Sequence, residues 1–469
     1  MGRLVSLLPA ALLLAAAVAP APALAANAAT RPVPYGMKTE KLPNGLSVVL
    51  VPFDSPGLAA YYTLVRVGAR NEVEEGHSGF AHFFEHMMFR GTKRFSAEAY
   101  NAQIKALGLD GNAFTADDVT IYTLFGPSAG LARAIELQAD RFQNLSFGEP
   151  EFQTEALAVL GEYNKNFSNP ENKLEEVLVD HAFTKHTYKH TTMGFERDIR
   201  AMPKQYGYAK KFFERFYRPD SCTIFVVGDF DGAAVMKQIT KEYGGWSGKA
   251  ETARVSTEPA QKSERVATVP WQSETLPRTM VGYHTPPLRD DTLDGAIQNL
   301  LGSYLFGPTS PLYQELVLGK QSAETLRPVY SDHRDPHLFS YLLVGKNAEA
   351  MAGIESATDA AIAEIRDGKV DAARLASIQS NMRYGLSLSL ETANSLAEQL
   401  AWYAGASGNP ESLNLLYENM ARVTPDDLVR FAKRHLGSSN RTVARLTKGA
   451  PAKAAKPPPP PATPKKGAK

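Results

Sequence analysis

Apolar residues alternate between strand-like and helix-like spacing along most of the chain. Two β-rich runs, 46–53 and 58–68, flank a turn-like Asp-Ser-Pro-Gly sequence, and a further strand is predicted over 113–127. Helical periodicity predicts amphipathic helices over three segments: 96–108, 128–144 and 149–167. Ser128 is the expected N-cap of the second helix. The alternation of both element types indicates a fold that contains sheets as well as helices.

A polar segment divides this pattern into two parts. Residues 247–270 lack large apolar side chains and end at a proline, so we predict a linker between a domain over 33–246 and a domain over 271–448. The two domains have a related plan, because an aromatic helix leads into a β-rich strand over 210–229 and again over 428–448. This repetition predicts a duplicated unit.

The two ends of the chain differ from the part between them. Residues 1–25 carry Arg3, an apolar run rich in Leu and Ala, and a final Ala-Leu-Ala, which together are typical of a cleaved signal peptide. A membrane anchor is the alternative, but two prolines interrupt the run. We therefore expect an exported protein, periplasmic or secreted, that begins near Ala26. Residues 449–469 are rich in Pro, Ala and Lys, which predicts a disordered or polyproline tail.

Composition and charge narrow the classes of function. The chain has 469 residues and a formal net charge of +1, so no overall field attracts it to nucleic acid or acidic lipid. Its one cysteine, Cys222, cannot form an intramolecular disulfide and excludes a Cys-based zinc or iron–sulfur cluster within one chain. No later segment reaches the roughly 18 apolar residues that a membrane span needs. We therefore expect that the protein neither binds nucleic acid nor spans a membrane.

One histidine pair has the spacing and setting of a metal site. His82 and His86 lie in Gly-Phe-Ala-His-Phe-Phe-Glu-His-Met-Met-Phe, a stretch without proline. On a helix, residues three and four apart share a face, so His82, Glu85 and His86 point the same way. Two imidazoles one turn apart can both reach a zinc ion at about 2.0–2.1 Å. This is the His-x-x-Glu-His pattern, the mirror in chain order of the zinc-binding His-Glu-x-x-His motif.

Two other pairs with the same spacing serve as internal controls. His333 and His337 flank Pro336, which forbids a regular helix, so the spacing does not place both rings on one face. His186 and His190 lie in a segment whose Thr, Lys and Gly content indicates a loop. We interpret both pairs as surface or structural histidines.

A catalytic zinc site needs a third protein ligand and an open position for water. Glu155 and Glu162 lie two helical turns apart on one face of the helix predicted over 149–167, among Leu, Ala and Val. An acidic side chain on an apolar stripe is costly unless it is paired or bound to metal. Either could also cap a neighbouring helix or pair with an arginine such as Arg133, but the histidines favour the metal role.

The stretch over 76–92, Gly-His-Ser-Gly-Phe-Ala-His-Phe-Phe-Glu-His-Met-Met-Phe-Arg-Gly-Thr, resembles the signature of a known family. It is similar to the inverted-motif zinc peptidases: pitrilysin, insulin-degrading enzyme and the mitochondrial processing peptidases. The resemblance extends from about Val33 to Lys448. It implies the short bacterial form of an α+β fold with two related domains, each a mainly antiparallel sheet packed with helices. The resemblance further implies that two such chains form a clam-shell chamber.

The resemblance also implies roles for particular residues. Glu162 corresponds to the family's third ligand, beside His82 and His86, for one zinc ion per chain. Glu155 corresponds to a companion glutamate that supports the site without binding the ion. The family's substrate-holding segment, before an edge strand, is matched by four residues: Asn112, Ala113, Phe114 and Thr115.

One region departs from the family pattern. Relatives carry an Arg and a Tyr in the second domain that contact substrate, but Pro311 stands where the arginine would be. Arg327 and Tyr330 are nearby, and no role is transferred to them. The resemblance therefore implies a heterodimer in which this chain bears the zinc and a homologous partner subunit supplies the Arg/Tyr pair. A homodimer is the alternative.

These features together predict a zinc metalloendopeptidase that hydrolyses peptides or small unfolded polypeptides, with Glu85 as general base for a zinc-activated water. Two alternatives stay open. In the first, the chain is a structural or assembly subunit in which zinc only stabilises the fold; Glu85 argues against it, since a structural site needs no base. In the second, it is a peptide-binding module with a coincidental motif, which metal analysis would separate.

Overall fold

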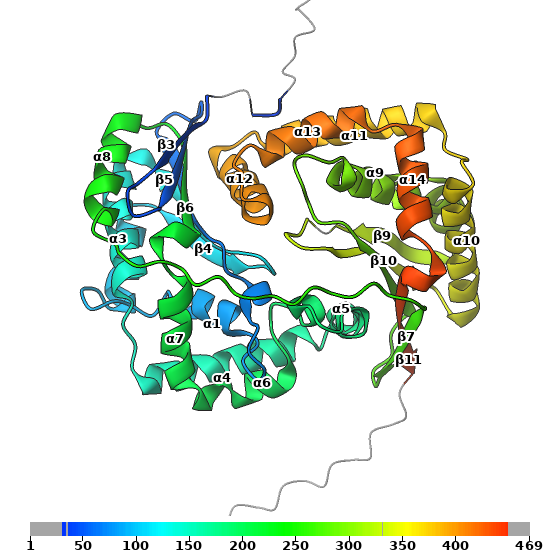
Figure 1. Cartoon of the computed structure of the whole chain (residues 1–469), viewed down its shortest axis with the longest axis horizontal. Coiled ribbons are helices and arrows are strands. Elements are labelled where there is room, and N and C mark those ends of the chain that lie inside the picture. Colours follow the sequence, from blue (N-terminus) through cyan, green and yellow to red (C-terminus); the bar gives the residue numbers. More distant parts are fainter. Residues whose placement is uncertain (1–30, 34–35, 331, 449–469) are drawn as a thin grey trace, which may run out of the picture.

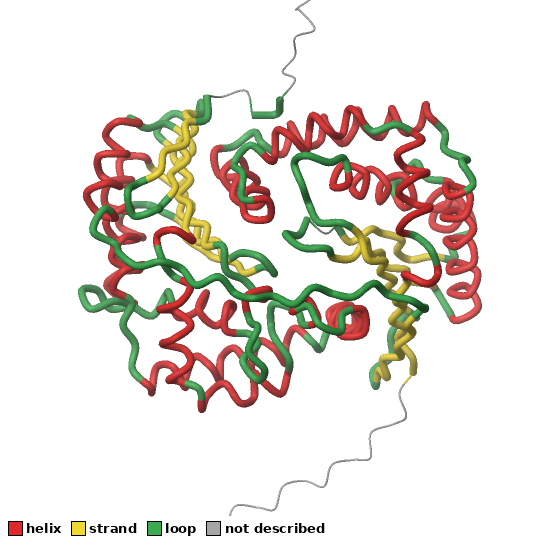
Figure 2. Tube along the Cα trace, viewed as in Figure 1, coloured by secondary structure: helices red, strands yellow, loops and turns green. Residues whose placement is uncertain are grey.

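Two β-sheets, one in each half of the chain, organise the fold. The computed structural model describes residues 31–33, 36–330 and 332–448, and in it each sheet is accompanied by helices (Figure 1). Residues 246–264 form no helix or strand and cross from one half to the other (Figure 2). The predicted α+β fold with two related, mainly antiparallel sheets is confirmed.

The first sheet has the strand order β1-β2-β6-β3-β5-β4. Its strands are β1 (Lys38–Lys41), β2 (Ser47–Pro52), β3 (Leu58–Val65), β4 (Asp110–Thr115), β5 (Thr120–Pro127) and β6 (Cys222–Gly228). Neighbouring strands are antiparallel, except that β2 and β6 are parallel. β4 lies at the edge and pairs only with β5, so one side of its backbone faces away from the sheet.

Eight α-helices follow in the part of the first half that the structure describes. They are α1 (Phe80–Met87), α2 (Ala97–Ala106), α3 (Leu131–Asn144), α4 (Glu149–Asn166), α5 (Pro170–Ala182), α6 (Glu196–Ala201), α7 (Tyr206–Phe216) and α8 (Gly232–Tyr243). An aromatic core joins α1 to α7, where the rings of Phe84 and Phe212 stack at 5.5 Å. This core holds α1 rigidly behind the sheet.

The second sheet repeats the topology of the first. Its strands are β7 (Arg265–Trp271), β8 (Arg278–Thr285), β9 (Ala323–Val329), β10 (His337–Gly345) and β11 (Arg441–Lys448), in the order β7-β11-β8-β10-β9. The parallel pair is β7 and β11, as β2 and β6 are in the first sheet. Without β1, the two sheets therefore have the same order, which supports the predicted duplication.

Helices of the second half follow the same plan. They are α9 (Asp294–Phe306), α10 (Ala348–Arg366), α11 (Ala372–Ser389), α12 (Ala393–Ser407), α13 (Ser412–Arg422) and α14 (Pro425–His435), with a π-helical segment at Tyr313–Gly319. Apolar side chains of α9, α10, α11, α13 and α14 form a separate core with the second sheet.

The two halves exchange one helix each. Helix α12 of the second half packs on β3 and β6 of the first sheet, and α5 of the first half packs on β7, β8 and β11 of the second (Figure 1). Leu396 and Leu400 of α12 are 1% and 0% exposed. Burying a leucine contributes about 1.5–3 kcal/mol relative to exposure, so this exchange ties the halves firmly together.

Several local predictions are confirmed and three are wrong in detail. Strands 46–53 and 58–68 appear as β2 and β3, and helices 96–108 and 149–167 appear as α2 and α4. The single strand over 113–127 is wrong, because a turn between Ala116 and Val119 splits it into β4 and β5.

The other two corrections concern boundaries. Ser128 is not a helix N-cap, because Ser128–Gly130 forms a 3₁₀ turn and α3 begins only after Gly130. The linker predicted to reach Pro270 ends earlier, because β7 begins at Arg265 and pairs with β11. The division into two domains at this segment stays a prediction.

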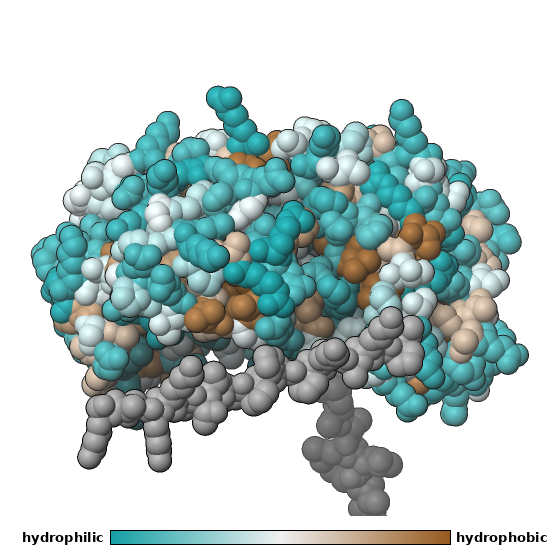
Figure 3. All heavy atoms as spheres, turned by 90° about the horizontal axis from the view of Figure 1, so that it is seen from below, coloured by the Kyte–Doolittle hydropathy of each residue, from teal (hydrophilic) through white to brown (hydrophobic). Residues whose placement is uncertain are grey.

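The face shown in Figure 3 is mostly hydrophilic, and hydrophobic residues form small separate patches on it. Among the described residues no helix is both long and apolar enough to cross a membrane. The signal peptide predicted over 1–25 and the tail predicted over 449–469 lie outside the described residues.

Candidate metal centre

Helix α1 carries His82, Glu85 and His86, as the His-x-x-Glu-His pattern predicts. Its apolar side chains, Phe80, Phe83, Phe84 and Met87, are buried in the core of the first half. The remaining face is directed to a cavity of about 530 Å³ whose lining includes His82 and Glu85. The amphipathic pattern therefore sets which way the three polar side chains point.

The start of α1 depends on two residues. Gly79 has a φ of 89°, and a Cβ there would lie 2.3 Å from Ile199 Cδ1, so only glycine fits. The buried carboxylate of Glu72 accepts hydrogen bonds from the N–H groups of Gly79 and Ala81, each at 2.7 Å. Burial raises the pKa of Glu72 to about 8, although these two hydrogen bonds oppose the rise. Glu72 thus satisfies backbone donors that the first helical turn leaves unpaired.

Three potential ligand atoms converge from α1 and α4. His86 Nε2 lies 3.3 Å from His82 Nε2 and 3.2 Å from Glu162 Oε2, and His82 Nε2 lies 3.7 Å from Glu162 Oε2. Donors that each lie about 2.0–2.1 Å from a tetrahedral zinc ion are about 3.3 Å apart. The His₂Glu set therefore fits a zinc ion with one position left open.

The protonation of the two histidines follows from their surroundings. Burial and the neighbouring His86 lower the pKa of His82 to about 4, so its imidazole is neutral near pH 7, which is the form that binds metal. Burial alone would lower the pKa of His86, but the hydrogen bond with Glu155 and the negative charges of Glu155, Glu162 and Glu85 together outweigh it and raise the pKa.

Glu155 contacts the outer side of the site. Its Oε1 lies 2.8 Å from His86 Nδ1, and its other oxygen forms an ion pair with Arg90. Burial would raise the pKa of Glu155, but the contacts with His86 and Arg90 outweigh it and lower the pKa. The alternative considered above, pairing with an arginine, is therefore met by Arg90 and not by Arg133, which contacts Gln103 and Glu136.

Glu85 lies next to the three-ligand cluster without joining it. Its Oε2 accepts a hydrogen bond of 2.7 Å from the Thr115 hydroxyl. Burial raises the pKa of Glu85, although Thr115 and His86 act in the opposite direction. Glu85, Glu162 and Thr115 all line the same cavity, so the carboxylate is open to a molecule bound there.

The predicted substrate segment falls on the edge strand. Asn112, Ala113, Phe114 and Thr115 are the last four residues of β4, which ends beside Glu85. Ala113 is buried, whereas Phe114 and Thr115 line the cavity. The side of β4 away from β5 offers backbone groups next to the candidate site.

The two control pairs of histidines differ in whether their rings come together. His186 contacts Asp335 at 2.9 Å, and buried His190 contacts the Thr191 carbonyl at 3.0 Å; within the described parts of the chain neither belongs to a group that could hold an ion. The prediction that His333 and His337 do not lie on a regular helix is confirmed, but the two rings come together in another way. Their rings stack at 3.7 Å with an angle of 4°, because a turn and the start of β10, and not a helix, bring them together.

In the region that lacks the family's Arg/Tyr pattern, Arg327 and Tyr330 both have partners within the chain. Arg327 lies on β9 and pairs with Glu171 of α5 at 2.9 Å. Tyr330 lines the cavity, and its hydroxyl lies 3.1 Å from Ser303 Oγ.

Comparison with known families agrees with this fold. Residues 55–196 match the family described as insulinase (peptidase family M16), and residues 206–382 match the peptidase M16 inactive domain. The chain belongs to peptidase family M16. The matched first region contains His82, Glu85, His86, Glu155 and Glu162.

Individual relatives extend the likeness over most of the chain. The zinc protease PqqE of Helicobacter pylori is 28% identical over 412 residues, which cover 86% of this chain and 91% of that protein. Mitochondrial-processing peptidase subunit beta of Saccharomyces cerevisiae is 22% identical over 437 residues, 88% of this chain and 91% of that protein. The crystal structure of a protease from Helicobacter pylori superposes with a TM-score of 0.81 at 27% identity, over 88% of this chain and 100% of that one.

Proposed function

We propose that the chain is a zinc-dependent endopeptidase that hydrolyses peptides bound in the cavity beside α1. The observation that carries this proposal is the distance set among His82, His86 and Glu162, which matches one tetrahedral ion, with Glu85 adjacent. Family membership and the zinc protease relative support it.

The three ligands would hold zinc, which lowers the pKa of bound water to about 7 and polarises a carbonyl group. Glu85 then takes a proton from the attacking water and delivers it to the leaving amine. The hydrogen bond from Thr115 orients this carboxylate toward the cavity. A base is needed only for catalysis, so Glu85 favours an enzyme over a structural subunit.

Substrate recognition follows from the edge strand. A peptide in extended conformation can add to β4 along Asn112–Thr115 through main-chain hydrogen bonds. Because Thr115 contacts Glu85, a peptide paired with this strand has its backbone next to the base. Recognition through the main chain implies broad sequence specificity for short or unfolded polypeptides.

The chain acts after export, with a second subunit that completes the chamber. The N-terminal sequence supports export to the periplasm or beyond. Pro311 in place of the family's arginine, and the pairing of Arg327 with Glu171, support a homologous partner that supplies the Arg/Tyr pair. A homodimer is the second arrangement to test.

Peptide cleavage by the purified chain, alone and with its partner subunit, tests the function. We expect cleavage of a quenched-fluorescence peptide that stops on chelation and returns when zinc is added. Cleavage that persists without metal contradicts the proposal. A zinc-loaded pair without cleavage would indicate an assembly subunit, and less than about one-tenth equivalent of bound zinc would indicate a peptide-binding module.

Substitution of Glu155 by glutamine tests its supporting role. The amide can still accept a hydrogen bond from His86 but lacks the charge, and it leaves Arg90 without its partner. We expect zinc affinity to fall about 10–100-fold, as measured by competition with a metal indicator. Glu149→Gln, an exposed change on the same helix, is the control. Equal affinities in both variants would show that Glu155 does not support the site.

A further inference from the structure

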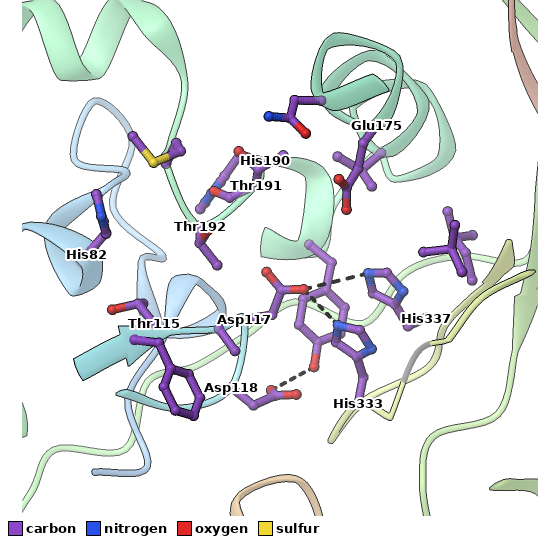
Figure 4. Close-up of a pocket in the computed structure, with 18 of the residues that line it drawn as sticks. His82, Thr115, Asp117, Asp118, Glu175, His190, Thr191, Thr192, His333 and His337 are labelled. Atoms are coloured by element: carbon purple, nitrogen blue, oxygen red, sulfur yellow. Dashed lines mark hydrogen bonds and ion pairs between the residues drawn. The ribbon is translucent and has the colours of Figure 1, made fainter. Parts of the chain in front are cut away.

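A second group of ligating side chains lies on the far side of the same cavity. Asp117, His333 and His337 have ligand atoms that all fall within 4.8 Å of one another. Figure 4 shows them across the cavity from His82 and Thr115. None of the three belongs to the candidate zinc site.

The three residues come from both halves of the chain. Asp117 lies in the turn between β4 and β5, and the two histidines lie just before and at the start of β10. Asp117 Oδ2 is 2.7 Å from His333 Nε2 and 3.9 Å from His337 Nε2. The side chains are 14–20% exposed, so they are open to the cavity but shielded from bulk solvent.

We propose that Asp117, His333 and His337 bind a second divalent metal ion, zinc or another first-row ion, that joins the two halves. Two imidazoles and a carboxylate form a common ligand set for such ions, with positions left for water. Ligands of a tetrahedral zinc ion lie about 3.3 Å apart. The two measured distances are about 0.6 Å below and above this value. The two imidazoles stack in parallel at 3.7 Å, so one ring must turn out of the stack before the in-plane lone pairs of both rings can reach one ion.

Neighbouring carboxylates favour a cation at this position. Glu175 of α5 and Asp118 line the same cavity, and Figure 4 shows Asp118 close to Asp117, with Glu175 on its helix above His337. Asp118 already accepts hydrogen bonds from the Tyr188 hydroxyl at 2.7 Å and the Arg334 N–H at 2.9 Å. Asp118 therefore contributes negative charge to the cavity and keeps its own structural partners.

The site lies where the halves already meet. Asp335, two residues from His333 and from His337, accepts a hydrogen bond from Arg70 of the first half at 2.6 Å and contacts His186 at 2.9 Å. A metal ion at Asp117 would add a bond of fixed geometry to this contact. It would hold β10 of the second half against the β4–β5 turn, and so fix the width of the cavity.

Metal content of site variants tests the proposal. We expect about two equivalents of zinc per wild-type chain after equilibrium dialysis, and about one in His82→Ala/His86→Ala. Asp117→Asn keeps a hydrogen-bond acceptor for His333 but removes the charged ligand. Added to His82→Ala/His86→Ala, it is expected to remove the remaining equivalent. His181→Ala, an exposed histidine on α5, is the control and should bind as wild type does.

Two further measurements complete the test. The unfolding temperature of His82→Ala/His86→Ala in chelator should be the same with and without Asp117→Asn, and zinc should raise it only in the chain that keeps Asp117. Cobalt absorption of His82→Ala/His86→Ala should show a bound ion that Asp117→Asn abolishes. The proposal is wrong if zinc and cobalt bind His82→Ala/His86→Ala equally well with and without Asp117→Asn. It is also wrong if neither of these two variants binds either metal. In both cases the three residues form a metal-free hydrogen-bonded contact. If only the endopeptidase proposal fails, His82→Ala/His86→Ala should still bind about one equivalent of zinc.

Discussion

Replacement of Glu85 by glutamine is expected to leave zinc bound and to lower turnover about 10²–10⁴-fold, the usual contribution of general acid–base catalysis. The ligand atoms belong to His82, His86 and Glu162, so the amide removes none of them. It also retains an oxygen that can accept the Thr115 hydrogen bond. What disappears is the group that accepts a proton from water. Peptide cleavage and zinc content, measured on the same preparation, separate the two effects.

An exposed glutamate provides the matched control for this experiment. Glu98→Gln makes the same chemical change on α2, away from the cavity lining, and should keep wild-type turnover. If Glu85→Gln cleaves peptides as fast as Glu98→Gln, another group is the base. If it loses zinc together with activity, Glu85 acts on the metal and the assignment also changes.

Replacement of His82 by alanine is expected to abolish both cleavage and zinc binding at α1. The imidazole supplies one of three converging donors, and its loss leaves His86 and Glu162, a set too small for a stable site. We expect affinity to fall by more than the roughly 100-fold limit typical of supporting residues. The fold should persist, because the surrounding core consists of aromatic side chains that α1 keeps.

Zinc titration with circular dichroism checks this expectation. The variant and His181→Ala should have the same spectrum in chelator, and only His181→Ala should regain activity with zinc. A His82→Ala chain that still cleaves in a zinc-dependent way would exclude this residue as a ligand.

The sequence predicts the centre at α1 well because the geometry there is local. Residues three and four apart on one helix must share a face, so His82, Glu85 and His86 follow from their spacing. Glu155 and Glu162 also share a face of one helix, but spacing cannot show that α4 packs beside α1. The family resemblance supplied that step, and the distances agree with it.

The second ligand group could not be predicted in the same way. His333 and His337 come together through a turn and a strand start, and Asp117 comes from a turn that the predicted single strand over 113–127 concealed. Two consecutive aspartates inside a β-rich run were the signal for that turn, since Asp favours turns over strands. Likewise, amphipathic helices show which face is apolar and not which sheet it covers, so the exchange of α5 and α12 required the structure.

That exchange has a consequence for biosynthesis. One face of the first sheet is covered by Leu396, Leu400 and their neighbours on α12, so a ribosome must translate about four-fifths of the sequence before this face can close. Until then the nascent first half exposes an apolar surface, which favours aggregation or binding by a chaperone. Shortened versions that stop before Ala393 would leave the same surface bare, and neither half is suited to production as a separate fragment.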